Sequence, residues 1–210
     1  MSPTRALFRR ELTLRLRSGG WAVGIGVLLV LGFLAPLAIG SEKEVLEAAG
    51  PGLLWVILGV AVFLGVEGLF EDDIASGATD LVLLSPVSLT RAAMMKLTVA
   101  WAVLAVPLMV AMPLLLLSYG GSLLGALALL LASPGMVFVA GTVSALCTSQ
   151  RRGAPLLVFL SLPLIIPPLV FGPSAGDGSV VPFLILGAYS LQAIAVCPSL
   201  TAAAIRLQLT

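Results

Sequence analysis

The chain has 210 residues, of which 60% are hydrophobic and only 10% are charged, and its mean hydropathy is +1.16. A soluble domain carries about 25% charged residues, so most of this surface must face lipid. The net charge of +1 provides no basic field for nucleic acid, and the sequence has no histidine, the usual general base and the commonest metal and haem ligand. We therefore expect a membrane protein that is not an enzyme and binds no cofactor, metal or nucleic acid directly.

The spacing of the charged residues predicts an all-α membrane protein with six transmembrane helices. About 20 consecutive apolar residues cross a bilayer as a helix. Four of the charge-free gaps fit one span each, and the long gap at 97–150 fits two, with a turn at 118–122. The expected spans are residues 21–39, 52–69, 97–117, 123–146, 154–171 and 181–204. We expect residues 1–210 to form a single transmembrane domain, with a short acidic loop at 42–50.

The distribution of lysine and arginine predicts that both chain termini are cytoplasmic. In that orientation all of the 11 lysines and arginines except Lys43 lie in cytoplasmic segments, as the positive-inside rule requires. The two cysteines, Cys147 and Cys197, lie near cytoplasmic helix ends and lack the CxxC spacing of metal or redox sites. Since that face is reducing, they are interpreted as small apolar side chains rather than a disulfide.

The N-terminal segment, residues 1–18, is basic and cytoplasmic, and two interpretations of it remain open. Phe8, Leu12 and Leu16 form an apolar stripe on a helical wheel, which favours a helix lying in the membrane interface. The alternative is that its arginines only anchor the first span on the cytoplasmic side.

The cytoplasmic loop at 71–96 carries the features that predict a protein contact. An acidic cluster ends the second span, Gly77 permits a turn, and Thr79 is expected to cap a short helix with Asp80 in its first turn. Pro86 ends that helix, and Ser88 or Thr90 caps the next one. Exposed leucines need a protein groove or the membrane interface to cover them, and both remain open. The candidate contact residues are Glu67, Glu71, Asp72, Asp73, Gly77, Thr79, Asp80, Leu81, Leu83, Leu84 and Pro86.

Prolines within the spans predict irregular helices. Each proline removes a backbone donor and disturbs the preceding turn. Pro163, Pro167 and Pro168 fall within six residues of one another, so we expect the fifth span to be broken there.

Several motifs resemble known transporter permeases. The sequence Gly-Ala-Thr-Asp-Leu at 77–81, then Leu-Ser-Pro-Val-Ser at 84–88 and Lys96, resembles ABC-2-type permeases, whose loop between helices 2 and 3 is a coupling helix that inserts into the ATPase subunit. A closer resemblance, over the whole chain, is to CcmB, the permease family of the cytochrome c maturation (haem exporter) complex. It rests on residues 36–40, 51–56, 67–73, 162–167 and 198–206.

The resemblance implies a multi-pass protein of the bacterial cytoplasmic (inner) membrane, present as a homodimer with two copies of the ATPase CcmA. It further implies association with the haem-handling membrane protein CcmC, the small subunit CcmD and the haem chaperone CcmE. ATP would bind the partner ATPase, and haem would be held by partner subunits. Whether haem crosses this subunit, or ATP hydrolysis instead drives release of the haem-loaded chaperone, is left open. The alternatives are an ABC-2 exporter of another lipophilic substrate and a passive membrane assembly scaffold.

Overall fold

A computed structural model describes residues 3–40, 42–148 and 153–209, without the side chains of 3–6, 80, 83, 153–162 and 209. The described residues are helical throughout apart from short connections, which confirms the all-α class. The helices are α1 (Pro3–Ser18), α2 (Gly20–Ile39), α3 (Lys43–Val66), α4 (Glu71–Ala75), α5 (Ala78–Leu83), α6 (Leu89–Ser118), α7 (Leu123–Cys147), α8 (Gly153–Ser174), the 3-10 turn η1 (Ala175–Asp177) and α9 (Val180–Leu209).

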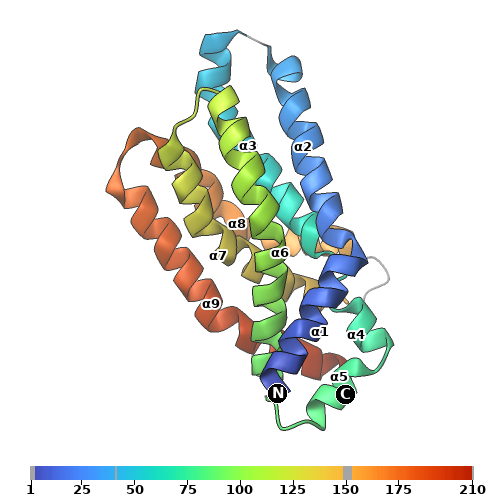
Figure 1. Cartoon of the computed structure of the whole chain (residues 1–210). Coiled ribbons are helices and arrows are strands. Elements are labelled where there is room, and N and C mark those ends of the chain that lie inside the picture. The colour runs from blue at the N-terminus through green and yellow to red at the C-terminus, as the bar shows by residue number, and fades with distance from the viewer. Residues whose placement is uncertain (1–2, 41, 149–152, 210) are drawn as a thin grey trace.

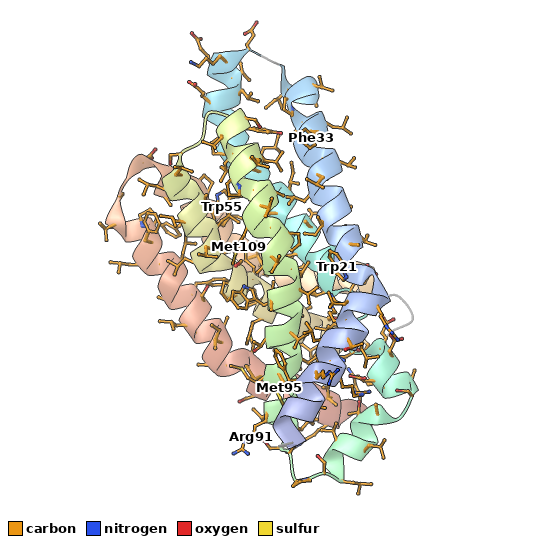
Figure 2. All side chains as sticks on the ribbon, in the orientation of Figure 1. Trp21, Phe33, Trp55, Arg91, Met95 and Met109 are labelled. Carbon is orange, nitrogen blue, oxygen red and sulfur yellow. The ribbon has the colours of Figure 1, made fainter. Side chains whose placement is uncertain are left out.

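Five stretches of the described chain are long and apolar enough to cross a bilayer: Gly20–Ile39, Lys43–Ala75, Leu89–Ser118, Leu123–Cys147 and Val180–Gln208. Figure 1 shows both chain ends, α4 and α5 gathered at the lower end of the elongated bundle, which we name the loop end. Large apolar side chains of the long helices are exposed, among them Val106 and Leu184. Phe33 points outward from α2 (Figure 2). Such a surface is typical of a helix bundle that lipid covers.

Helix α3 is longer than expected at its start and ends slightly earlier. It begins at Lys43, so the segment expected to be an acidic loop forms its first turns. Glu44 lies in the first turn, where a carboxylate interacts favourably with the helix dipole, and Lys43 pairs with Glu47 one turn later at 3.6 Å. The helix ends at Val66, and Gly68 follows with a φ of +66°, so Glu67 lies after the helix rather than inside it.

The turn expected at 118–122 is confirmed, and it has a defined geometry. Gly120 has a φ of +72°, which only glycine adopts without strain. The N–H of Gly121 donates to the carbonyl of Leu116 at 2.8 Å, and the N–H of Gly120 donates to Leu117 at 3.2 Å. This Schellman arrangement satisfies the last carbonyls of α6 before Ser122 caps α7.

The break expected at Pro163, Pro167 and Pro168 is not present. Helix α8 is continuous from Gly153 to Ser174 and contains all three prolines. Proline fixes φ near the helical value, so its cost lies in the missing donor and in crowding of the preceding turn rather than in an incompatible backbone angle. Packing against α3 and α7 supports the helix here, and Ile165 is fully buried.

Helix α7 is the centre of the bundle and packs against α9, α8, α6 and α3. Polar contacts join it to its neighbours: Trp101 Nε1 donates to Ser133 Oγ at 3.1 Å, and the hydroxyls of Thr142 and Thr201 lie 2.9 Å apart. Such interhelical hydrogen bonds add to van der Waals packing where lipid provides no hydrophobic driving force. Both cysteines are buried and free, in agreement with their interpretation as small core side chains.

Helices α2 and α3 approach each other closely at a pair of small residues. A Cβ placed on Gly24 would lie 2.3 Å from the backbone oxygen of Ala61 and 2.9 Å from the Cα of Gly65. A second close contact joins α3 to α8, because a Cβ on Gly172 would lie 2.3 Å from Trp55 Cδ2. These contacts hold the loop end of α3 against α2 and the middle of α3 against α8.

Candidate coupling site

The loop between α3 and α6 folds into two short helices separated by a glycine turn. Gly77 has a φ of +69°, which confirms the turn predicted there. Ser76 ends α4, and its hydroxyl donates to the carbonyl of Asp72 at 2.6 Å. After α5, the hydroxyl of Ser88 caps α6 by accepting a hydrogen bond from the N–H of Arg91 at 3.4 Å. Of the two candidate caps, Ser88 and Thr90, the cap is therefore Ser88.

Helix α5 presents two opposite faces. Thr79 was expected to cap it, but the helix begins at Ala78, so Thr79 lies in the first turn with its side chain buried. Val82, one turn later, packs against the core. Leu81 and Leu84 point the other way and are 70% and 86% exposed. The side chains of Asp80 and Leu83 lie outside the described residues, and Pro86 is exposed after the helix.

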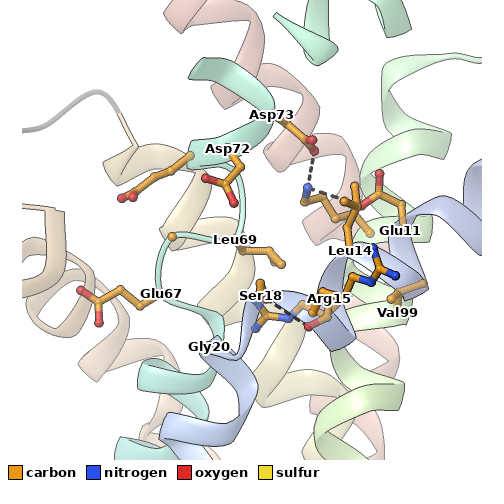
Figure 3. Close-up of a pocket in the computed structure, with 14 residues that line it drawn as sticks. Glu11, Leu14, Arg15, Ser18, Gly20, Glu67, Leu69, Asp72, Asp73 and Val99 are labelled. Atoms are coloured by element: carbon orange, nitrogen blue, oxygen red, sulfur yellow. Dashed lines mark hydrogen bonds and ion pairs between the residues drawn. The ribbon is translucent and has the colours of Figure 1, made fainter. Parts of the chain in front are cut away.

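Four charged side chains from α1, α4 and α6 form a closed group, which we name the charge ring: Arg10, Glu11, Asp73 and Lys96. Arg10 lies 2.8 Å from Glu11 and 3.5 Å from Asp73. Lys96 lies 3.4 Å from Glu11 and also pairs with Asp73, so each cation contacts both carboxylates. Figure 3 shows the carboxylate of Glu11, on α1, and that of Asp73, on α4, pointing into the charge ring.

Much of the charge ring is shielded from solvent. Glu11 is only 7% exposed, and the Lys96 side chain is 13% exposed, with its amine 5.3 Å from the centre of the Phe70 ring. Electrostatic attraction is stronger where water is excluded, so these pairs are screened less than surface salt bridges. The sequence did not indicate this ring, because residues 10 and 11 are remote from 73 and 96 and no local spacing joins them.

Arg15 binds the end of α3 from the neighbouring helix α1. Its guanidinium donates to the carbonyl of Gly65, one of the last four carbonyls of α3, which have no partner within that helix. A cation at this end also interacts favourably with the helix dipole. Arg15 is 8% exposed, and burial lowers its pKa to about 10, so it remains charged at neutral pH. It therefore ties α1 to α3.

A cavity of about 460 Å³ opens beside the charge ring and Arg15. Three exposed carboxylates line it, those of Glu67, Glu71 and Asp72, and among the described residues none of them forms an ion pair (Figure 3). Asp73 therefore differs from the other acidic residues predicted for the contact site, because cations of the protein itself balance its charge. In the part of the chain that the structure describes, no group of three or more His, Cys, Asp or Glu side chains is placed to hold a metal ion.

The family model described as "CcmB protein" matches residues 3–208. The chain belongs to the CcmB family. "Heme exporter protein B" of Bradyrhizobium diazoefficiens is 35% identical, with 98% of each chain covered. The proteins of the same name from Rhodobacter capsulatus and Escherichia coli K12 are 31% and 33% identical, over 98% and 97% of this chain and 99% and 97% of their own. The chain is therefore a multi-pass membrane protein and a non-catalytic transporter subunit.

Proposed function

We propose that this chain is the membrane permease subunit of an ABC transporter complex required for haem delivery and c-type cytochrome maturation. It would couple ATP hydrolysis in a partner ATPase to haem transfer or to release of the haem chaperone. The observation that supports this role is the CcmB family match over residues 3–208, together with relatives named heme exporter protein B that align over nearly their whole length.

The ATPase would dock on the α4–α5 loop. Leu81 on α5 and Leu84 directly after it are exposed, and no described residue covers them, so an apolar groove on the ATPase is the partner that fits. The carboxylates of Glu67, Glu71 and Asp72, which have no ion-pair partner among the described residues, lie on the same loop. Charge complementarity would place lysine or arginine side chains on the rim of that groove.

The proposed complex contains two copies of this chain, two CcmA-like ATPases, a CcmC-like haem-handling protein, a small CcmD-like subunit and a CcmE-like haem chaperone. Haem would be held by these partners, because this chain has no histidine to serve as an axial ligand. An exporter of another lipophilic substrate would need only the ATPase, and a passive scaffold would need no ATP hydrolysis.

We further propose six spans in the bacterial inner membrane, formed by α2, α3, α6, α7, α8 and α9 as one domain, with the loop end in the cytoplasm. Among the described residues, the lysines and arginines lie on α1, in the first turns of α6 and in the last turn of α9, whereas Lys43 begins α3 at the opposite end. This distribution supports the orientation. Helix α1 would lie along the interface, because it turns Glu11 and Arg15 inward and leaves Phe8 and Leu16 exposed.

Cysteine labelling tests this topology. In a background with Cys147→Ala and Cys197→Ala, we expect Ser179→Cys, exposed at the end opposite the loop end, to react with an impermeant maleimide in intact cells. Ser76→Cys, exposed on the α4–α5 loop, should react only after lysis. The reverse pattern would show that the loop end is not cytoplasmic.

A complementation experiment tests the function. We expect this chain, expressed with its own complex partners, to restore haem-stained c-type cytochromes in a bacterium whose CcmB-family subunit is deleted. Restoration should disappear when the co-expressed ATPase carries a substitution that abolishes hydrolysis. Cytochromes that mature with the inactive ATPase would favour the passive scaffold, and failure to mature in the presence of active partners would favour an exporter of another substrate.

A further inference from the structure

The α4–α5 loop has little stability of its own. Helix α4 has five residues, none of them buried, and α5 has six. Forming a helix of one turn or so is unfavourable in isolation, because nucleation fixes several residues for a single hydrogen bond. The position of this loop must therefore be set by contacts with the rest of the protein, and among the described residues Asp73 provides its only ion pairs.

Lys96 connects that loop to the rigid bundle. Lys96 lies on the 30-residue helix α6. The next residue, Leu97, is fully buried, so α6 is packed into the bundle at this point. Its amine pairs with Asp73 on α4 and with Glu11 on α1, so one side chain joins three helices. Arg10, the other cation, belongs to α1, so it links α4 to α1 but provides no connection to α6.

We propose that Lys96 is the positioning residue of the coupling loop, and that the charge ring makes α1 part of the same mechanical unit as α4 and α5. This inference rests on the proposed docking of an ATPase on the loop. A displacement of α5 by the ATPase would be passed through Asp73 and Lys96 to α6, and through Glu11 to α1. Arg15 would then carry the movement of α1 to the end of α3.

Hydrogen exchange in the purified complex tests the proposal directly. We expect Lys96→Met to increase amide exchange of residues 7–15 and 71–75 by about tenfold, while the ATPase still co-purifies. ATP hydrolysis should continue, but haem-stained c-type cytochromes should decrease, because the ATPase moves a loop that is no longer fixed to α6. Lys96→Arg should preserve both the slow exchange and maturation. Lys43→Met is the matched control, since it removes a cation from an exposed pair at the opposite end.

A double-mutant cycle separates positioning from a general loss of stability. Lys96→Met and Asp73→Asn should be strongly non-additive in their effect on exchange, because both remove the same ion pair. Additive effects would overturn the proposal, as would normal exchange of both segments in Lys96→Met. If Lys96→Met lost maturation while α1 and α4 exchanged as slowly as in the unmodified protein, the positioning role would also be wrong.

The docking site is tested separately by substitutions on the exposed face of α5, which do not touch the charge ring. An ATPase that stays bound when Leu81 and Leu84 are replaced would refute the proposed docking site. The exchange results on α1 and α4 would still decide whether Lys96 fixes the loop.

Discussion

Leu81→Asp combined with Leu84→Asp is expected to release the ATPase subunit while the protein remains inserted in the membrane. Both side chains are among the most exposed apolar groups of the loop end, at 70% and 86%. Burying a leucine contributes about 1.5–3 kcal/mol, so losing two from a docking interface should weaken binding by roughly 10²–10⁴-fold.

Co-purification of the ATPase with the tagged protein measures this effect, and a haem stain of c-type cytochromes reports its consequence. The matched control is Ser76→Asp, which adds a carboxylate to an exposed position of the same loop without removing an apolar side chain. The control should retain the ATPase. If the double variant retains it too and cytochromes mature normally, α5 is not the docking element.

Gly24→Leu is expected to cause a large loss of stability. The new Cβ would meet a backbone oxygen of Ala61 at 2.3 Å, and backbone atoms cannot rotate away as a side chain can. Helices α2 and α3 would have to separate, at a cost of about 3 kcal/mol or more. Because Gly65 is in the same contact, the separation would also disturb the carbonyl that Arg15 binds.

The two buried cysteines provide the measurement. A thiol-reactive dye added during heating in detergent reports exposure of Cys147 and Cys197, so Gly24→Leu should lower the midpoint of labelling by several degrees or more. Gly26→Leu lies on the same helix with no atom within 4 Å of its new Cβ, and it should label at the original temperature or slightly above. Equal midpoints for the two variants would show that the α2–α3 contact is looser than described.

Apolar length and charge placement predicted the long helices well, because a bilayer imposes both. The failures came where packing outweighs local preference. Residues 42–50 were predicted as a loop from their charge, yet from Lys43 on they form the outer turns of α3, where water can solvate their carboxylates. The prolines of α8 predicted a break, but the helix is continuous and packs against α3 and α7.

The candidate coupling site was predictable only in part. Gly77, the α5 helix and its exposed leucines follow from local rules for turns, caps and apolar side chains. The partners of Asp73 could not be predicted, since nothing in a single sequence relates Arg10 or Lys96 to it. Local rules also misplaced Thr79. Its position after Gly77 suggested a helix cap, but Thr79 lies in the first turn of α5 and is buried by tertiary packing.

The charge ring also has a consequence for how the protein is made. Its members appear in the order 10, 11, 73 and 96, so α1 is synthesised long before the residues that complete the ring. While the ribosome is still producing α2 and α3, Glu11 can pair only with Arg10 on its own helix, and the α3 carbonyl that Arg15 binds is not yet in place. At that stage α1 must remain hydrated or rest among lipid head groups. The helix can reach its final position only once α6 has emerged and delivered Lys96. Docking of α1 is therefore a late step in biogenesis, and until it occurs the loop on which we propose that the ATPase docks lacks its link to α1.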